Sequence, residues 1–250
     1  MNVKHVVGFS GGAASAVCAK IVADQHFDST VLLFHDTKTE PSDNERFRSS
    51  VAEFIGLPIT EDSDGRNIWE LFRDEGHLGN GRNACCSRVL KQQRSMAYMK
   101  KHTGAILYIG FTVDESHRCQ RTFARYNSCG VEVRFPLVEL KICKDEVLHR
   151  VERCWGLIKP KRYDFLDHAN CIPCIKGKKA YWGLMHMFER DAWETASAAE
   201  DEFGCTIFTD YGSLRDELDG CLLLAKRYLR KREYNNAQGS LFEYPCECSV

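Results

Sequence analysis

Apolar and polar positions follow two spacings over the first half of the chain. Short apolar runs at 3–9, 30–34, 57–60, 105–110 and 131–136 are typical of buried strands. Between them, apolar residues recur every three or four positions, which predicts helices at 14–24, 43–55, 68–74 and 88–101. The second of these helices has Phe47, Val51 and Phe54 near one face. Strands that alternate with helices predict an α/β fold with a doubly wound, mostly parallel sheet.

Helical spacing dominates the second half. It predicts helices at 144–154, 178–199 and 213–232, with one short strand at 206–208. Residues 235–250 are polar and rich in turn formers, which indicates a mobile tail. We therefore expect an α/β domain over residues 1–177, followed by a helical extension and tail over residues 178–250.

The turn between the first strand and the first helix is the most informative segment. It reads Ser10-Gly11-Gly12-Ala13-Ala14-Ser15. Backbone N–H groups converge at such a turn, the helix dipole adds partial positive charge, and glycines let a ligand approach closely. The turn lacks the lysine of a Walker P-loop and the spacing of the dinucleotide GxGxxG motif. It predicts a phosphate or pyrophosphate site, with a plain tight turn as the alternative.

Two further strand ends carry polar residues. Asp36 follows the second strand, where a carboxylate suits Mg²⁺ or a ribose hydroxyl, or simply caps a turn. Arg118 and Arg121 follow the strand that ends at Gly110, and their guanidinium groups suit phosphate or sulfate oxygens, with a solvated loop as the alternative. Because ligands bind beyond the carboxyl ends of parallel strands, the loops after Phe9, Phe34 and Ile109 are expected to meet at one site.

Composition narrows the class of protein. The chain has 250 residues and a net charge of −1, so no overall basic field attracts nucleic acid. Local basic clusters occur at 176–179 and 226–232. No apolar run approaches the roughly 20 residues that cross a membrane, and the N-terminal residues do not resemble a secretory leader. We expect a cytoplasmic protein with no membrane partner.

Thirteen cysteines are many for such a chain, and without a leader they indicate metal or redox chemistry rather than disulfides. Cys85 and Cys86 are adjacent, and Cys171 and Cys174 form a CxxC pair. Four thiolates suit zinc or a [4Fe–4S] cluster, whereas CxxC alone is typical of a zinc knuckle or a redox dithiol. Cys205, Cys246 and Cys248 remain as candidate reactive thiols, and the role of each stays open.

These motifs together resemble one superfamily. The Ser10–Ser15 turn resembles the loop of the PP-loop ATP pyrophosphatases, and the Glu-Ser…Arg segment after Gly110 resembles the phosphoadenylyl-sulfate reductases. The Cys-Cys and CxxC set resembles the [4Fe–4S] motif of assimilatory adenylyl-sulfate reductases. The resemblance runs from about residue 3 to residue 177, and it implies an adenine nucleotide alpha hydrolase-like fold that binds ATP and Mg²⁺ and carries a [4Fe–4S] cluster. It implies nucleotide contacts at Phe9, Ser10, Gly11, Gly12, Ser15, Phe34, Asp36, Gly110, Ser116, Arg118 and Arg121, and metal ligation by Cys85, Cys86, Cys171 and Cys174.

One departure from the reductases shapes the functional hypothesis. The Glu-Cys-Gly-Leu-His motif of their C-terminal region does not occur here. The chain is most similar to the iron–sulfur sulfurtransferases of DNA phosphorothioation, with tRNA thiolation as a variant. This implies an ATP pyrophosphatase that activates a nucleic acid for sulfur incorporation, with Asp36, Arg118 and Cys205 as candidate catalytic residues. A partner protein that presents the nucleic acid and a cysteine desulfurase that donates sulfur are the implied partners, while a homo-oligomer stays open.

Two alternatives remain from the sequence. The first is a sulfonucleotide reductase that releases sulfite from adenylyl sulfate or its 3′-phosphate. The second is a non-enzymatic, zinc-stabilised nucleotide-binding module.

Overall fold

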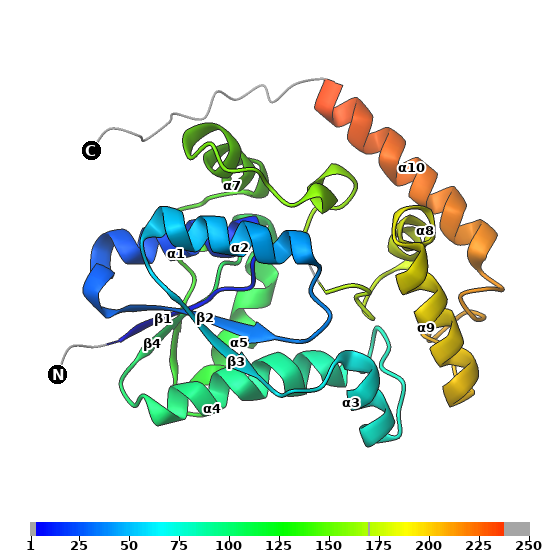
Figure 1. Ribbon diagram of the computed structural model, residues 1–250, viewed down its shortest axis with the longest axis horizontal. Helices are drawn as coiled ribbons and strands as arrows, with labels where there is room; N and C mark the ends of the chain where they lie inside the picture. Colours follow the sequence, from blue (N-terminus) through cyan, green and yellow to red (C-terminus); the bar gives the residue numbers. More distant parts are fainter. Residues whose placement is uncertain (1–3, 170, 238–250) are drawn as a thin grey trace.

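Five parallel strands form one sheet at the centre of the protein. The computed structural model describes residues 4–169 and 171–237. The strand order is β3-β2-β1-β4-β5, so the chain first runs outward from β1 to one edge and then continues on the other side of β1 (Figure 1). Val7 at the centre pairs in register with Leu32 and Tyr108. The predicted α/β fold is confirmed, with strands β1 (His5–Gly8), β2 (Thr30–Asp36), β3 (Ile59–Ser63), β4 (Ile106–Tyr108) and β5 (Glu132–Arg134).

Helices cover both faces of this sheet, because successive strand residues point to opposite sides. Val7 and Leu32 face one core, which α1 and α2 complete. Val6 and Leu33 face the other, which α4 and α5 complete. The helices that form these layers are α1 (Ala13–His26), α2 (Ser42–Ile55), α4 (Arg94–Lys101) and α5 (Cys119–Asn127) (Figure 1).

The strand order creates a switch point between β1 and β4. The connection after β1 leads to α1 on one face of the sheet, whereas the connection after β4 leads to α5 on the other. Connections that diverge in this way open a crevice beyond the carboxyl ends of the two strands. The fold therefore places the Ser10–Ser15 turn and the segment after β4 side by side.

Short helical segments connect the main elements. The predicted helix at 88–101 begins as a π-helical turn and continues as α4, and the predicted helix at 144–154 likewise ends in a π-helical turn. The connecting elements are η1 (Phe27–Ser29), α3 (Ile68–Glu75), η2 (Ser87–Gln93), η3 (Val113–Arg118), α6 (Pro136–Glu139), α7 (Lys144–His149), η4 (Arg150–Cys154) and η5 (Lys161–Asp164).

Three helices follow the α/β part and, with α3 and η2, form a second core beside the sheet (Figure 1). They are α8 (Lys179–Phe188), α9 (Arg190–Phe203) and α10 (Leu218–Ala237). The helices α8 and α10 approach closely at Gly183, where an added Cβ would lie 2.2 Å from the carbonyl oxygen of Cys221. Only a residue without a side chain permits this crossing. No helix in the described part of the chain is long and apolar enough to span a membrane.

The structure corrects several predictions for the helical half. The predicted helix at 178–199 is broken at Glu189, whose backbone leaves the helical region and whose carboxylate pairs with the buried Arg162 at 3.2 Å. The predicted strand at 206–208 is absent, because the Ile207 N–H donates to the carboxylate of Glu200 rather than to a neighbouring strand. The last helix begins at Leu218 instead of residue 213.

Two further expectations need revision. Phe54 is 40% exposed and stacks on Trp155, whereas Phe47 and Val51 are fully buried, so the buried stripe of α2 is narrower than predicted. Residues 235–237 belong to α10 rather than to the predicted tail, and residues 238–250 lie outside the described residues.

Glu200 on α9 organises the connection from α9 to α10. Its side chain is buried, and its two carboxylate oxygens accept hydrogen bonds from the Ile207 N–H at 2.8 Å and the Leu214 N–H at 2.7 Å. Burial raises the pKa of Glu200, while the two backbone donors oppose that rise. A single carboxylate thus satisfies two buried backbone donors in a loop without regular structure.

We expect Glu200→Gln to destabilise the protein by about 1–3 kcal/mol and to lower Tm by roughly 3–9 °C, because a glutamine amide nitrogen faces one N–H and leaves it unpaired. Thermal unfolding followed by circular dichroism measures this change. The matched control is Glu194→Gln on the same helix, whose side chain is exposed and pairs only with Arg190. Equal Tm losses in the two variants would contradict the role assigned to Glu200.

Candidate functional site

A cavity of about 470 Å³ opens at the switch point of the sheet. Its volume lies within the range of ligand pockets, which is about 300–1,000 Å³. The loops after β1, β2 and β4 all contribute to its lining, as the sequence predicted. Of the predicted site residues, Ser10, Gly12, Ser15, Gly110, Arg118, Cys86, Cys171 and Cys174 line it.

The Ser10–Ser15 turn forms one wall of this cavity. Gly11 has a φ of +77°, which is a conformation that favours glycine, and Gly12 is the N-cap of α1 without a side-chain cap. The Ser15 hydroxyl donates to the Gly12 carbonyl at 2.8 Å. The exposed Ser10 hydroxyl in turn donates to the Ser15 hydroxyl at 3.3 Å. The first turn of α1 holds no acidic residue. This wall presents a positive helix end, which suits an anion.

Tyr163 lies against the same helix end, although it is 150 residues away in sequence. Its hydroxyl accepts a hydrogen bond from the Ala13 N–H at 3.0 Å. Burial raises the pKa of Tyr163 to about 12, even though backbone N–H groups of Ala13 and Ala169 favour its ionised form. The phenol is therefore neutral at physiological pH, and its proton remains free to donate into the cavity that Tyr163 lines.

The segment after β4 forms the facing wall. Gly110 packs against the first turn of α1, where an added Cβ would lie 2.7 Å from the Ala14 carbonyl oxygen. The absence of a side chain at Gly110 thus brings the two loops together. Thr112 lines the cavity, is fully buried, and its hydroxyl has no hydrogen-bond partner. A buried hydroxyl without a partner calls for an explanation, and a polar ligand in the cavity would supply one.

The three polar residues predicted in this segment, Arg118, Ser116 and Arg121, differ in their position relative to the cavity. Arg118 lines the cavity, pairs with Glu115, and its guanidinium lies 4.2 Å from the centre of the Phe111 ring. Ser116 and Arg121 are exposed and lie outside the lining. Of the three, only Arg118 is placed to meet a bound anion directly.

Asp36 ends β2 but does not line the cavity, whereas its neighbour Thr37 does. The Asp36 carboxylate accepts the Lys38 N–H at 2.8 Å and pairs with the Lys38 ammonium at 2.6 Å. Burial alone would raise the pKa of Asp36, but these bonds from Lys38 lower it. Lys38 itself has a φ of +55°. Asp36 therefore caps the turn in this structure, as the alternative interpretation of the sequence proposed.

Phe9 and Phe34 are core residues beneath the loop rather than part of its surface. Between them and the loop lies Arg48 of α2, which sequence reasoning missed. Its guanidinium stacks on the Phe34 ring at 3.6 Å, and its Nη1 lies 3.5 Å from the position of an added Cβ on Gly11. Arg48 is 5% exposed, and Nη1 has no hydrogen-bond partner. A buried cation thus sits directly behind the turn.

Three of the four predicted metal ligands line the same cavity, namely Cys86, Cys171 and Cys174. Burial raises the pKa of Cys86 to about 12, with further contributions from the nearby Cys171 and Cys174. Cys171 is 3.3 Å from the Thr37 hydroxyl and donates to a Glu40 carboxylate oxygen at 3.2 Å. These contacts hold the thiols against the loop after β2. Thiols gathered in this way match the donor set of an iron–sulfur cluster.

The other candidate cysteines from the sequence do not line the cavity where the structure describes them. Cys85 is 3% exposed and packs in the second core. Cys205 is exposed at the end of α9 and does not line the cavity, while Cys246 and Cys248 lie outside the described residues. Among residues 4–169 and 171–237, no three His, Cys, Asp or Glu side chains are arranged as a metal cage. Cys86 and Cys174 pack against this same core, so Cys85 lies next to the thiols of the cavity without lining it.

The cavity also contains charged residues that the motifs did not reveal. Lys91, Lys144 and Lys176 line it, together with His168. Burial alone would lower the pKa of Lys91, but Cys171 and Glu40 raise it. Burial lowers the pKa of His168, whose Nδ1 has no hydrogen-bond partner. Helical spacing around Lys91 gave no sign that it faces a site.

Comparison with known proteins identifies the family of the chain and a similar fold. Residues 4–138, just over half of the chain, match the family model of the phosphoadenosine phosphosulfate reductase domain. No curated protein matches significantly. Among solved structures, the chain is similar to the U34-tRNA thiolase NcsA from Methanococcus maripaludis with its [4Fe–4S] cluster, at a TM-score of 0.50 and 16% identity. The match covers 100% of this chain and 77% of the thiolase, and it concerns the fold alone. The chain belongs to the phosphoadenosine phosphosulfate reductase domain family.

Proposed function

We propose that the protein is a sulfur-transfer enzyme that cleaves ATP to activate a nucleic acid. The observation that carries this proposal is the shared cavity, which is lined by both the phosphate-type loop and three thiols. A nucleotide site or a thiol site alone would have several explanations. Their union in one space of about 470 Å³ favours a reaction that uses both.

The loop side suits the triphosphate of ATP. The α1 N-terminus and the Tyr163 hydroxyl offer donors, while Arg118 and Lys144 offer positive charge to phosphate oxygens. In the proposed step, an oxygen of the nucleic acid attacks the α-phosphorus, and the bond to the bridging oxygen breaks. Pyrophosphate leaves with the electron pair of that bond, and a sulfur nucleophile later displaces AMP. Positive charge around the leaving pyrophosphate lowers the barrier.

The thiol side suits sulfur delivery. Cys86, Cys171 and Cys174 are the residues that would hold a [4Fe–4S] cluster, with Cys85 as the fourth thiol that the sequence motif adds. Such a cluster, when bound, supplies iron at which sulfur can be held. The chain's own contribution is to position the thiols, through the contacts of Cys171 with Thr37 and Glu40.

The finer assignments rest on the sequence resemblance. DNA phosphorothioation is the proposed process, with tRNA thiolation as its variant, and a nucleic-acid-presenting protein and a cysteine desulfurase are the proposed partners. Mg²⁺ is proposed to accompany ATP. The runner-up is a sulfonucleotide reductase, because the matched domain family carries that name. The reductases' Glu-Cys-Gly-Leu-His motif does not occur within these 250 residues.

A parallel assay separates the two activities. We expect anaerobically purified protein to release pyrophosphate from ATP and Mg²⁺ when nucleic acid is added, and to release no sulfite from adenylyl sulfate with a dithiol reductant. Pyrophosphate and sulfite are measured in the same preparation, with a reaction that lacks nucleic acid as the control. Sulfite without pyrophosphate would establish the reductase instead.

Tyr163→Phe is expected to weaken ATP binding by roughly tenfold, because one hydrogen bond to a charged phosphate is worth about 1.5 kcal/mol or more. Isothermal titration with a non-hydrolysable ATP analogue measures the affinity. Tyr211→Phe serves as the control, since Tyr211 is exposed and lies outside the cavity. If the Tyr163→Phe variant bound the analogue more tightly, the phenol would be a competitor of phosphate rather than a donor to it.

Cys86→Ser, Cys171→Ser and Cys174→Ser are each expected to lower the iron and sulfide content of the anaerobically purified protein, because a hydroxyl is a poor ligand for an iron–sulfur cluster. Cys205→Ser, whose thiol is exposed outside the cavity, is expected to leave that content unchanged. Metal and acid-labile sulfide analysis checks both expectations. Zinc without iron in the wild-type protein would support the zinc-stabilised module.

A further inference from the structure

A group of cations on the outer side of α10 has no role in the cavity chemistry. We propose that Lys226, Arg227, Arg230 and Lys231, here called the α10 basic face, bind the phosphate backbone of a nucleic acid and lead it toward the cavity. This inference rests on the proposed function, because it assigns the surface that holds the substrate of that reaction.

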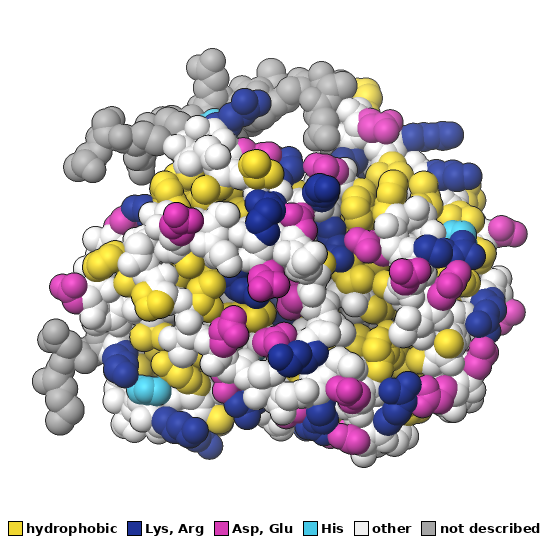
Figure 2. Space-filling view, viewed as in Figure 1, with side chains coloured by type: hydrophobic (Ala, Val, Ile, Leu, Met, Phe, Trp, Pro, Cys, Tyr) yellow, Lys and Arg dark blue, Asp and Glu magenta, His cyan; other side chains and the backbone are white. Residues whose placement is uncertain are grey.

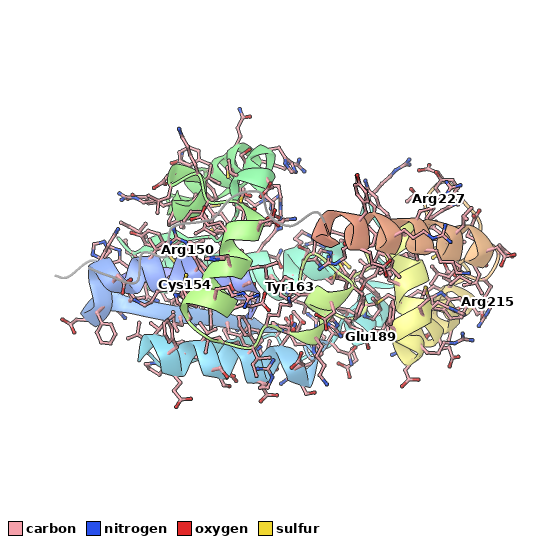
Figure 3. All side chains as sticks on the ribbon, turned by 90° about the horizontal axis from the view of Figure 1, so that it is seen from above. Arg150, Cys154, Tyr163, Glu189, Arg215 and Arg227 are labelled. Atoms are coloured by element: carbon pink, nitrogen blue, oxygen red, sulfur yellow. The ribbon has the colours of Figure 1, made fainter. Side chains whose placement is uncertain are left out.

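The packing of α10 fixes which side faces outward. Cys221 and Ala225 are buried against α8, at the close crossing over Gly183. All four cations of the α10 basic face are exposed, and Figure 2 shows dark-blue side chains along this outer side, at the upper right. Arg227 is labelled on α10 in Figure 3. The packing of α10 against α8 therefore turns the α10 basic face toward solvent.

These cations differ from their neighbours because they lack acidic partners. On the adjoining α9 and its flanks, Glu194 pairs with Arg190, and Asp201 pairs with Arg215. No ion pair within the described part of the chain includes any member of the α10 basic face. The acidic residues of α10 itself are Asp219 and Glu233. Four uncompensated cations within six residues repel one another, which an external polyanion would relieve.

Arg232 ties this helix to the cavity. It pairs with Asp167, which lines the cavity, and donates to the carbonyl oxygen of Tyr163. Figure 3 shows Tyr163 at the place where the α/β part and the helices meet. Lys144 and Lys176 continue the positive charge within the cavity lining. A strand held on the outer side of α10 would therefore lie within one helix diameter, roughly 10–12 Å, of the cavity wall that Arg232 contacts on the inner side.

The spacing of the cations favours a nucleic acid as the occupant. Six residues of helix rise by about 8 Å, a length over which one strand carries about two charges, or a duplex about four to five. A protein partner fits less well, because a cluster of exposed charges differs from the charge-depleted core of protein interfaces. DNA and RNA share this backbone chemistry, so the experiment must tell them apart.

The test measures binding of the full-length protein to labelled tRNA and to a labelled DNA duplex, without ATP, over a range of salt concentrations. In the Lys226→Ala/Arg227→Ala/Arg230→Ala/Lys231→Ala variant we expect the Kd for at least one polymer to rise more than about tenfold. The negative slope of log K against log salt is expected to become shallower by roughly 2–3. The polymer that shows this change is the one that uses the surface. Lys226→Arg/Lys231→Arg is expected to retain binding.

The matched control removes four exposed cations elsewhere, with Lys100, Lys101, Arg125 and Arg153 each changed to alanine. An equal loss in this control, no loss in the α10 variant, or equally tight binding of polyglutamate would overturn the inference. Melting curves of all variants show whether each is folded. Because ATP is absent from this binding assay, its result does not depend on the pyrophosphate assay. Binding through α10 here, with no pyrophosphate released in that separate assay, would refute the proposed function and leave this inference standing.

Discussion

The cavity depends on a few long-range hydrogen bonds that hold residues 162–169 and 171–174 against the carboxyl ends of the strands. The Ile172 N–H donates to the Thr39 carbonyl at 3.0 Å, and the Tyr163 hydroxyl accepts the Ala13 N–H. Together with the contacts of Cys171 with Thr37 and Glu40, they fix the position of the CxxC segment relative to the loop. Each bond contributes only about 1 kcal/mol net, so their effect is to select one arrangement rather than to stabilise the fold as a whole.

Electrostatics around the loop follow from the same arrangement. The Ser10–Ser15 turn has no cation of its own, yet Arg48 lies behind it and Arg118 faces it across the cavity. A buried guanidinium with an unpaired N–H is costly, and its stacking on Phe34 offsets only part of that cost. An anion at the loop would offset more. Arg48 and Arg118, which come from other segments, thus supply the positive charge that the Ser10–Ser15 turn lacks.

Sequence patterns were informative where the physics is local. Strands, the order of helices and the meeting of loops at the strand ends follow from periodicity and from the rules for parallel sheets. Tyr163 and Arg48 could not be predicted in this way, because their positions depend on packing between segments far apart in sequence. Lys38 shows the limit of local motifs: its positive φ lets Asp36 fold back on the turn, so a carboxylate at a strand end caps the chain.

Charge separation explains how a chain with a net charge of −1 can suit a polyanion. Carboxylates such as Glu194 and Asp201 are neutralised by arginines on the same or a neighbouring segment. Screening limits exposed charges to a range of about 8 Å at physiological salt, so a distant carboxylate does little to cancel Arg227. Local pairing, rather than the total count of charges, therefore decides which surface attracts an anion. In this protein four exposed cations that have no ion pair among the described residues lie close together on the helix that Arg232 fastens to the wall of the cavity.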